Sequence, residues 1–263
     1  MTQNPFAVVT GASSGIGLEL AKQFAEHGFD LLVVAEDAEL SDAANELRSH
    51  GVSVEAVQAD LATDEGVDSV WQTIRRGGRP VDALALNAGR GAGGAFVGGT
   101  RLEDELEIVA LNCRSTVHLA KHVLPGMVER GAGRVLITSS IASTMPGSYQ
   151  AVYNASKSFT QAFALGIREE LSDTGVTVTA LMPGPTDTEF FERADMLDTE
   201  IGSGDKDDPA QVAEQAFKGL MNGDERVRGG SLSSRLQGAV SRVLPDAVKS
   251  KAHAGMAKPG SGN

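Results

Sequence analysis

The sequence predicts one α/β domain of the doubly wound type, with about seven parallel strands and helices on both faces of the sheet. Short, nearly continuous apolar runs alternate with longer segments of helical periodicity along most of the chain. Strands buried on both faces of a parallel sheet have this continuous apolar character. A glycine-rich turn directly after the first apolar run supplies the strand-to-helix connection from which such sheets are built.

Six segments are predicted to be strands, and a weaker seventh follows them. Each is short, mostly aliphatic and bounded by turn residues. Because a helix-length segment separates most neighbours, we expect parallel pairing through right-handed crossovers. The predicted strands are Phe6–Thr10, Leu31–Ala35, Val52–Gln58, Val81–Leu86, Arg134–Ser139, Val176–Met182 and, more weakly, Arg226–Gly229.

Helices are predicted between these strands, where apolar residues recur at intervals of three and four. Asp208 followed by Pro209 marks one helix start, as N-cap and first helical residue. The predicted helices are Gly15–His27, Leu40–Ser49, Asp64–Arg76, Leu102–Glu129, Tyr153–Ser172 and Ala210–Met221.

Two segments interrupt this alternation. Residues 186–207 are acidic and weakly periodic, and we expect them to form a mobile lid. Residues 1–230 are predicted to form the Rossmann-type domain, and residues 231–263 a partly helical C-terminal extension. An amphipathic stretch at 234–243 is the helical candidate there, and we expect the last ten or so residues to be disordered.

Charge and composition exclude several classes of partner. The net charge of −12 argues against binding to nucleic acid or to an anionic membrane surface. No uninterrupted run of 18 apolar residues predicts a membrane span. The single cysteine allows no intramolecular disulfide, and the first residues do not look like a signal peptide. We therefore expect a cytoplasmic protein whose substrate is a small molecule.

The turn after the first strand contains Gly11, Gly15 and Gly17, and a helical pattern begins within it. A dinucleotide pyrophosphate needs a tight turn, a close approach free of side chains, and backbone N–H groups at a helix N-terminus. The alternative is a simple strand-to-helix turn. The strand and helix that the motif requires are both present here, which favours a dinucleotide cofactor.

Glu36 follows the second strand, about 20 residues beyond the glycines, where an acid accepts hydrogen bonds from the adenosine ribose. Its carboxylate would repel a 2′-phosphate, and neither the glycine turn nor this strand end contains Arg or Lys. We therefore predict NAD in preference to NADP, which stays possible. The alternative for Glu36 is a solvated loop acid.

Tyr153 and Lys157 begin a predicted helix and lie on one face of it, four residues apart. An ammonium group placed there can stabilise a phenolate, so that the phenol exchanges a proton with a substrate oxygen near neutral pH. The fifth strand ends in Ser139 and Ser140, at the sheet edge where doubly wound folds bind ligands. A serine at this edge can hydrogen-bond the same substrate oxygen.

Together these motifs resemble the short-chain dehydrogenase/reductase family along roughly residues 5–230. In that family the serine stands thirteen residues before the tyrosine, which selects Ser140 over Ser139. The matching motifs, in order, are Thr10-Gly11-x-x-x-Gly15-Ile16-Gly17, Asp60-Leu61, Asn87-Ala88-Gly89, Asn112, Ser140, Tyr153-x-Ala155-Ser156-Lys157 and Pro183-Gly184.

The resemblance implies roles for these residues. Tyr153 would be the general acid/base, and Lys157 would lower its pKa and bind the nicotinamide ribose. Ser140 would orient the substrate oxygen, and Asn112 would hold a water in a proton relay behind Lys157. No metal is required. The implied cofactor-binding residues are Gly11, Ser13, Ser14, Gly15, Ile16, Gly17, Glu36, Asp60, Leu61, Asn87, Ala88, Gly89, Tyr153, Lys157, Pro183, Gly184, Thr186 and Thr188.

The predicted function is therefore NAD(P)-dependent interconversion of a secondary alcohol and a ketone. An NADPH-dependent carbonyl reductase and a catalytically silent, nucleotide-sensing regulator are the alternatives. The resemblance also implies a homodimer or homotetramer, assembled through the helices Leu102–Glu129 and Tyr153–Ser172.

Five side chains near or outside the expected site are considered separately. Arg90 would either meet an anionic substrate or lie on the surface, and Phe190 and Phe191 would either cover an apolar substrate or simply pack. His118 and His122 have a spacing that can bind a metal, but no nearby acid is evident from the sequence, so we predict no metal site.

Overall fold

The computed structural model describes residues 3–231 and 245–262. Its strands form one parallel sheet in the order β3-β2-β1-β4-β5-β6-β7. The predicted fold class is confirmed, and every predicted strand is present with both ends within two residues of the expected positions. The strands are β1 Phe6–Thr10, β2 Asp30–Ala35, β3 Val54–Gln58, β4 Ala83–Leu86, β5 Gly133–Thr138, β6 Val176–Leu181 and β7 Arg226–Val227.

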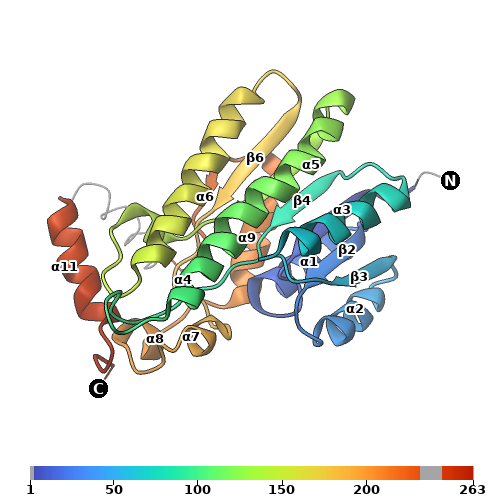
Figure 1. The fold of residues 1–263 in the computed structure, drawn as a ribbon. Helices are drawn as coiled ribbons and strands as arrows, with labels where there is room; N and C mark the ends of the chain where they lie inside the picture. The colour runs from blue at the N-terminus through green and yellow to red at the C-terminus, as the bar shows by residue number, and fades with distance from the viewer. Residues whose placement is uncertain (1–2, 232–244, 263) are drawn as a thin grey trace.

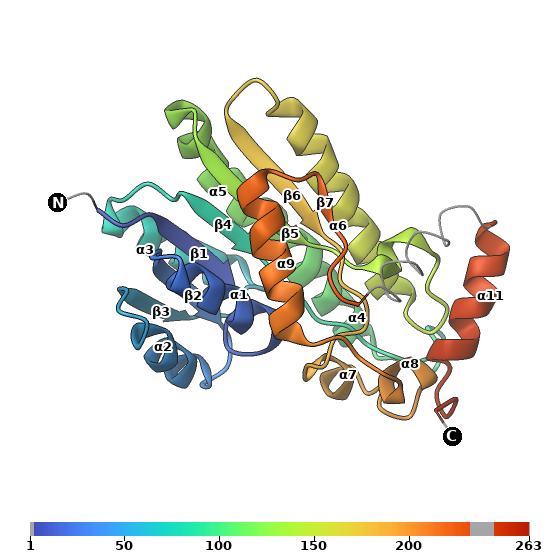
Figure 2. The same cartoon turned by 180° about the vertical axis from the view of Figure 1, so that it is seen from behind.

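Helices cover both faces of this sheet, as the two opposite views of Figures 1 and 2 show. One face packs against α1 Gly15–Glu26, α2 Leu40–Arg48 and α9 Pro209–Asn222. The other packs against α3 Asp64–Gly77, α5 Ser115–Arg130 and α6 Ala151–Glu170.

The sheet buries apolar side chains on both of its faces. All six residues of β2 are buried, and the burial of Leu31–Ala35 agrees with their continuous apolar sequence. On the α1 and α9 face, the rings of Phe24 and Phe217 meet edge to face, 5.2 Å apart. Asp208 caps α9 by accepting a hydrogen bond from the Ala210 N–H, which agrees with the predicted helix start.

The order of the strands fixes where a ligand can bind. Strand β1 pairs with β2 on one side and with β4 on the other, so the chain direction of the crossovers reverses between β1 and β4. Doubly wound sheets bind ligands beyond the carboxyl ends of the strands at this point. The glycine turn follows β1 and the Asn87–Gly89 segment follows β4, so both lie at this crevice.

The predicted single helix Leu102–Glu129 is wrong in one respect. The structure divides it into α4 Leu102–Ile108, a π-helical segment η1 Val109–Arg114, and α5. A π-helical segment adds a residue to the turn and leaves the apolar periodicity on either side intact, so the sequence does not reveal it. The segment carries Asn112, whose side chain is only 1% exposed and fully hydrogen-bonded.

The expected lid, residues 186–207, contains the short helices α7 Phe190–Arg193 and α8 Glu200–Ser203. A β-bridge between Thr186 and Asp207 closes its base. Met196, which lies between these two helices in the sequence, is completely buried. The mobility of this segment stays a prediction.

The expected disorder of the last ten or so residues is wrong for residues 254–262. A helix, α11 Asp246–Ala257, lies beside α8 in Figure 1, and Ala257 is fully buried. The Gly260 N–H donates to the Asp198 carboxylate, which fixes the chain beyond the helix. The sequence pattern is weak because α11 buries mainly His253 and Ala257 instead of a stripe of large apolar residues.

Three other predictions stay untested. The amphipathic stretch at 234–243 lies outside the described residues, and the domain boundary at residue 230 stays a prediction. So does the homo-oligomer, although exposed apolar side chains lie on the helices expected to form it, such as Leu106, Val117 and Phe159. None of the helices within residues 3–231 and 245–262 is long and apolar enough to cross a membrane.

Candidate active site

A cavity of about 620 Å³ opens beyond the carboxyl ends of the strands. Segments that follow β1, β2, β3, β4, β5 and β6 all contribute to its wall, together with α6, the lid and α11. Every residue predicted to bind the cofactor lines this cavity, as do Ser140, Tyr153 and Lys157. Asn112 is the one predicted site residue that does not line it.

The glycine turn leaves a cradle without side chains at the N-terminus of α1. Gly11 and Gly15 have φ angles of +65° and +54°, a conformation that favours glycine. A Cβ at Gly17 would lie only 1.8 Å from the Gly11 carbonyl oxygen. The first turn of α1 carries no acidic residue. The N-terminus of α1 therefore fits an anionic group such as a pyrophosphate.

The far end of the cavity, beyond β2, is acidic. Glu36 is exposed there, and Asp37 follows it. Arg193 belongs to the lid helix α7. Its guanidinium pairs with Asp37 at 3.3 Å and with Glu189 at 2.6 Å. Sequence reasoning missed Arg193, because 156 residues separate it from Asp37 and only the fold brings the two together.

Lys157 lies at the floor of the cavity on α6 and is only 5% exposed. Its Nζ donates a hydrogen bond to the Thr138 carbonyl oxygen at 3.1 Å and lies 5.8 Å from the ring centroid of Tyr153. Burial lowers the pKa of Lys157 to about 8, because an ammonium group loses its hydration there. The amine is thus held one helical turn behind the phenol, as its spacing predicts.

Lys157 is not among the groups that lower the pKa of Tyr153 in this structure, and its expected role there stays a prediction. Burial raises the pKa of Tyr153 to about 12, and only the hydrogen bond with Ser140 acts to lower it. The physical reason is that desolvation penalises a phenolate at this depth. At neutral pH the Tyr153 hydroxyl therefore carries its proton.

The two serines at the end of β5 have different environments, although both are buried. The Ser139 hydroxyl donates to the Lys157 carbonyl oxygen at 2.7 Å, which ties β5 to α6. The Ser140 hydroxyl accepts from the Ala142 N–H at 3.1 Å and hydrogen-bonds Tyr153. Ser140 is therefore the serine placed beside the phenol, in agreement with its spacing from Tyr153.

Asn112 connects the loop after β4 to α6. Its Oδ1 accepts from the Arg90 N–H, and its Nδ2 donates to the Arg90 carbonyl and to Ser156 Oγ, all at 2.9 Å. Only Gly89 separates it from the amine: a Cβ there would lie 3.1 Å from both Asn112 Oδ1 and Lys157 Nζ. Asn112 therefore positions the loop that passes over Lys157, and its part in a water relay stays a prediction.

The remaining wall of the cavity comes from the lid and from α11. The Phe190 ring lies 5.1 Å from the Tyr153 ring, and Met145 and Met256 also face the cavity. The His253 Nδ1 hydrogen-bonds the Ser148 carbonyl oxygen at 3.0 Å, and its Nε2 lies 3.4 Å from Asn154 Nδ2. Sequence reasoning missed His253 and Met256, because nothing in the tail indicates that it returns to this site.

Comparison with known proteins agrees with this geometry. Residues 5–196 match the family model described as short chain dehydrogenase. The chain belongs to the short-chain dehydrogenase family. Members of this family are oxidoreductases that act on CH–OH groups with NAD(P), and this chain is such an enzyme.

Individual relatives cover most of this short-chain dehydrogenase. It is 36% identical over 187 residues to a putative ketoacyl reductase of Streptomyces coelicolor, covering 69% of this chain and 70% of the relative. It is 33% identical over 186 residues to a serine 3-dehydrogenase of Rhizobium radiobacter, covering 70% and 72%. Among solved structures, a short-chain dehydrogenase from Sphingobium yanoikuyae in complex with NADPH aligns with a TM-score of 0.80 at 30% identity, covering 92% and 96%.

The close approach at Gly17 generates a test of the cradle. Gly17→Ala forces the turn to move, because the new Cβ would collide with the Gly11 carbonyl, and we expect the cofactor affinity to fall at least tenfold. Gly77→Ala is the matched control, since a Cβ at Gly77 meets nothing within 4 Å. Fluorescence titration with the reduced cofactor measures both, and urea unfolding checks that each variant folds. Equal affinity in the two variants would contradict the cradle.

Proposed function

We propose that this short-chain dehydrogenase interconverts a secondary alcohol and a ketone, with Tyr153 as the proton donor and acceptor. The observation that carries the proposal is the placement of one phenol between Ser140 and the buried amine of Lys157, inside the cavity that also contains the glycine cradle. When bound, the nicotinamide would exchange a hydride with the substrate carbon. The protein's own part is to hold the oxygen and to move its proton.

The protonation states of Tyr153 and Lys157 support different roles for the two side chains. With a pKa of about 12, Tyr153 is a protonated phenol at neutral pH, ready to donate to a carbonyl oxygen as that oxygen gains charge. With a pKa of about 8, Lys157 is mostly cationic at pH 7 and can stabilise the phenolate that remains. Ser140, hydrogen-bonded to the phenol, is positioned to orient the same substrate oxygen.

The cavity wall supports a largely apolar substrate. Phe190, Met145 and Met256 face the cavity, and Phe190 packs beside Tyr153. The Arg90 guanidinium forms an ion pair with Glu107. Its charge is therefore already compensated, which removes the main reason to expect an anionic substrate.

For the cofactor we propose NAD in preference to NADP. The carboxylates of Glu36 and Asp37 lie at the end of the cavity beyond β2, where a 2′-phosphate would be repelled. Arg193 is the cation beside them, and its guanidinium is paired with Asp37 and Glu189. That same guanidinium favours the alternative, an NADPH-linked carbonyl reductase, if it exchanges a carboxylate for a phosphate. The Sphingobium relative was solved with NADPH.

Dissociation constants of both cofactors test this preference. We expect NADH to bind more tightly than NADPH to the wild-type protein. Glu36→Gln should reduce the difference between the dissociation constants of NADH and NADPH, because it removes a negative charge and keeps a side chain of similar shape. Fluorescence titration gives both constants. Tighter binding of NADPH to the wild type would contradict the proposal and favour the carbonyl reductase.

The reaction itself is tested on the two tyrosines of the chain. Tyr153→Phe removes the hydroxyl, and we expect kcat to fall by about 10²–10⁴ with little change in cofactor affinity. Tyr149→Phe is the matched control, because Tyr149 does not line the cavity. A panel of apolar secondary alcohols and ketones, followed by nicotinamide absorbance, measures both variants. Unchanged turnover by Tyr153→Phe, or no turnover by the wild type, would overturn the proposal.

A further inference from the structure

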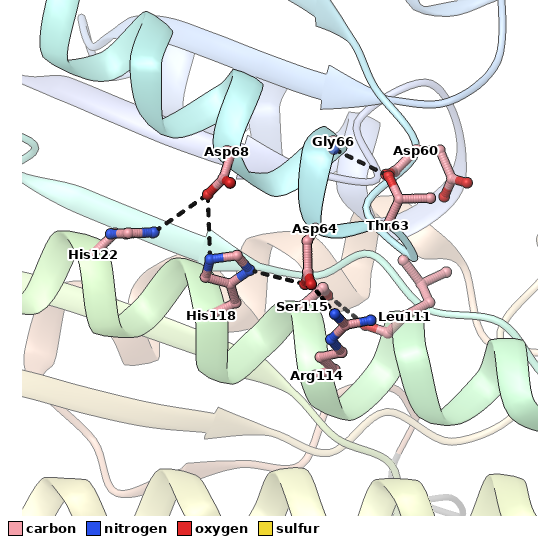
Figure 3. Close-up of polar contacts among 10 residues, drawn as sticks. All are labelled: Asp60, Thr63, Asp64, Gly66, Asp68, Leu111, Arg114, Ser115, His118 and His122. Atoms are coloured by element: carbon pink, nitrogen blue, oxygen red, sulfur yellow. Dashed lines mark hydrogen bonds and ion pairs between the residues drawn. The ribbon is translucent and has the colours of Figure 1, made fainter.

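Two histidines that the proposed reaction does not use lie beside an aspartate on a neighbouring helix. His118 and His122 project from one face of α5, and Asp68 projects toward them from α3, as Figure 3 shows. The expectation that no acid is near these histidines was wrong. The sequence could not reveal the contact, because the packing of α3 against α5 brings together residues 50 positions apart.

Two of the three separations between the candidate ligand atoms suit a small metal ion. His118 Nε2 lies 3.3 Å and His122 Nε2 lies 3.6 Å from Asp68 Oδ1. Taken one from each residue, the three candidate ligand atoms lie within 4.8 Å of one another. A tetrahedral ion with bonds of about 2.0–2.1 Å separates its ligand atoms by about 3.3–3.4 Å. Two of the three separations are thus already close to that value.

One imidazole nitrogen in this cluster is left without a hydrogen bond. His122 Nε2 is buried and has no hydrogen-bond partner among the described residues. The Trp71 ring stacks on the His122 ring at 5.1 Å and 11°, which holds the imidazole in place. The nitrogen therefore faces Asp68 at 3.6 Å, a separation too long for a hydrogen bond and suited to an ion between the two.

A second carboxylate, which also pairs with Arg114, lies beside His118. Asp64, one helical turn before Asp68 on α3, places its carboxylate 3.5 Å from His118 Nδ1. Protein metal sites use this arrangement, in which a carboxylate orients the imidazole through the nitrogen that does not bind the metal. The side chains of His118 and His122 are 27% and 32% exposed, so the cluster lies near the surface of the molecule.

We propose that Asp68, His118 and His122 form a site for a divalent transition metal of the zinc type, with water as the fourth ligand. Two imidazoles and one carboxylate are a ligand set that zinc accepts. None of the three residues lines the cavity of the proposed reaction. The ion would join α3 to α5 across the surface of the molecule, and so stabilise the packing of the two helices.

Zinc titration of the full-length, metal-free protein tests the proposal, with a chromophoric chelator as competitor. We expect one equivalent of Zn²⁺ to bind and the melting temperature to rise. His122→Ala and Asp68→Asn should each weaken binding at least tenfold and abolish the rise. His50→Ala is the matched control, because His50 is an exposed histidine outside the cluster and its loss should change neither result.

Cobalt gives a second readout that does not depend on stability. Co²⁺ bound to the wild type should show the intense visible absorption of tetrahedral coordination, and His122→Ala should lose it. The melting temperature of each metal-free variant checks that it folds. If His122→Ala does not fold, Asp68→Asn, which keeps the side-chain size, takes its place in the comparison. No stoichiometric binding by the wild type, or equal binding by the cluster variants, would overturn the proposal.

Discussion

The burial of the Lys157 amine is the constraint on which the active site depends. An ammonium group loses its hydration at this depth, so the protein must bring polar groups to it and still leave room for a ligand. The Thr138 carbonyl accepts its hydrogen bond, and the Gly89 backbone passes so close that a side chain there would crowd Nζ. Asn112 fixes this passage by holding the Arg90 backbone on both its N–H and its carbonyl.

The two ends of the cavity are built on the same principle. At each end a glycine permits a close approach: Gly17 lies against the Gly11 backbone, and Gly89 lies against the side chains of Asn112 and Lys157. Both segments follow strands that are neighbours in the sheet, β1 and β4. The strand order therefore determines that a cofactor cradle and a proton-transfer site share one crevice.

Sequence reasoning succeeds here wherever the signal is local. The strands, the glycine turn and the spacing of Ser140, Tyr153 and Lys157 depend on short-range periodicity and on fixed offsets. It fails where packing between segments distant in the sequence determines the structure. The π-helical segment at Asn112, the return of α11 with His253, and the contact of Asp68 with His118 leave no local pattern. The raised pKa of Tyr153 could not be predicted either, because four-residue spacing indicates a neighbouring amine and says nothing of desolvation.

The pKa of Lys157 in the ligand-free protein tests the account most directly. Heteronuclear NMR of the lysine Nζ resonances, with Lys157→Met to assign the signal, would follow its titration. Burial without a neighbouring carboxylate predicts a midpoint of about 8, well below the ordinary lysine value of 10.5. A midpoint at the ordinary value would show that water reaches the amine, and would contradict the buried arrangement from which the proposed proton transfer is derived.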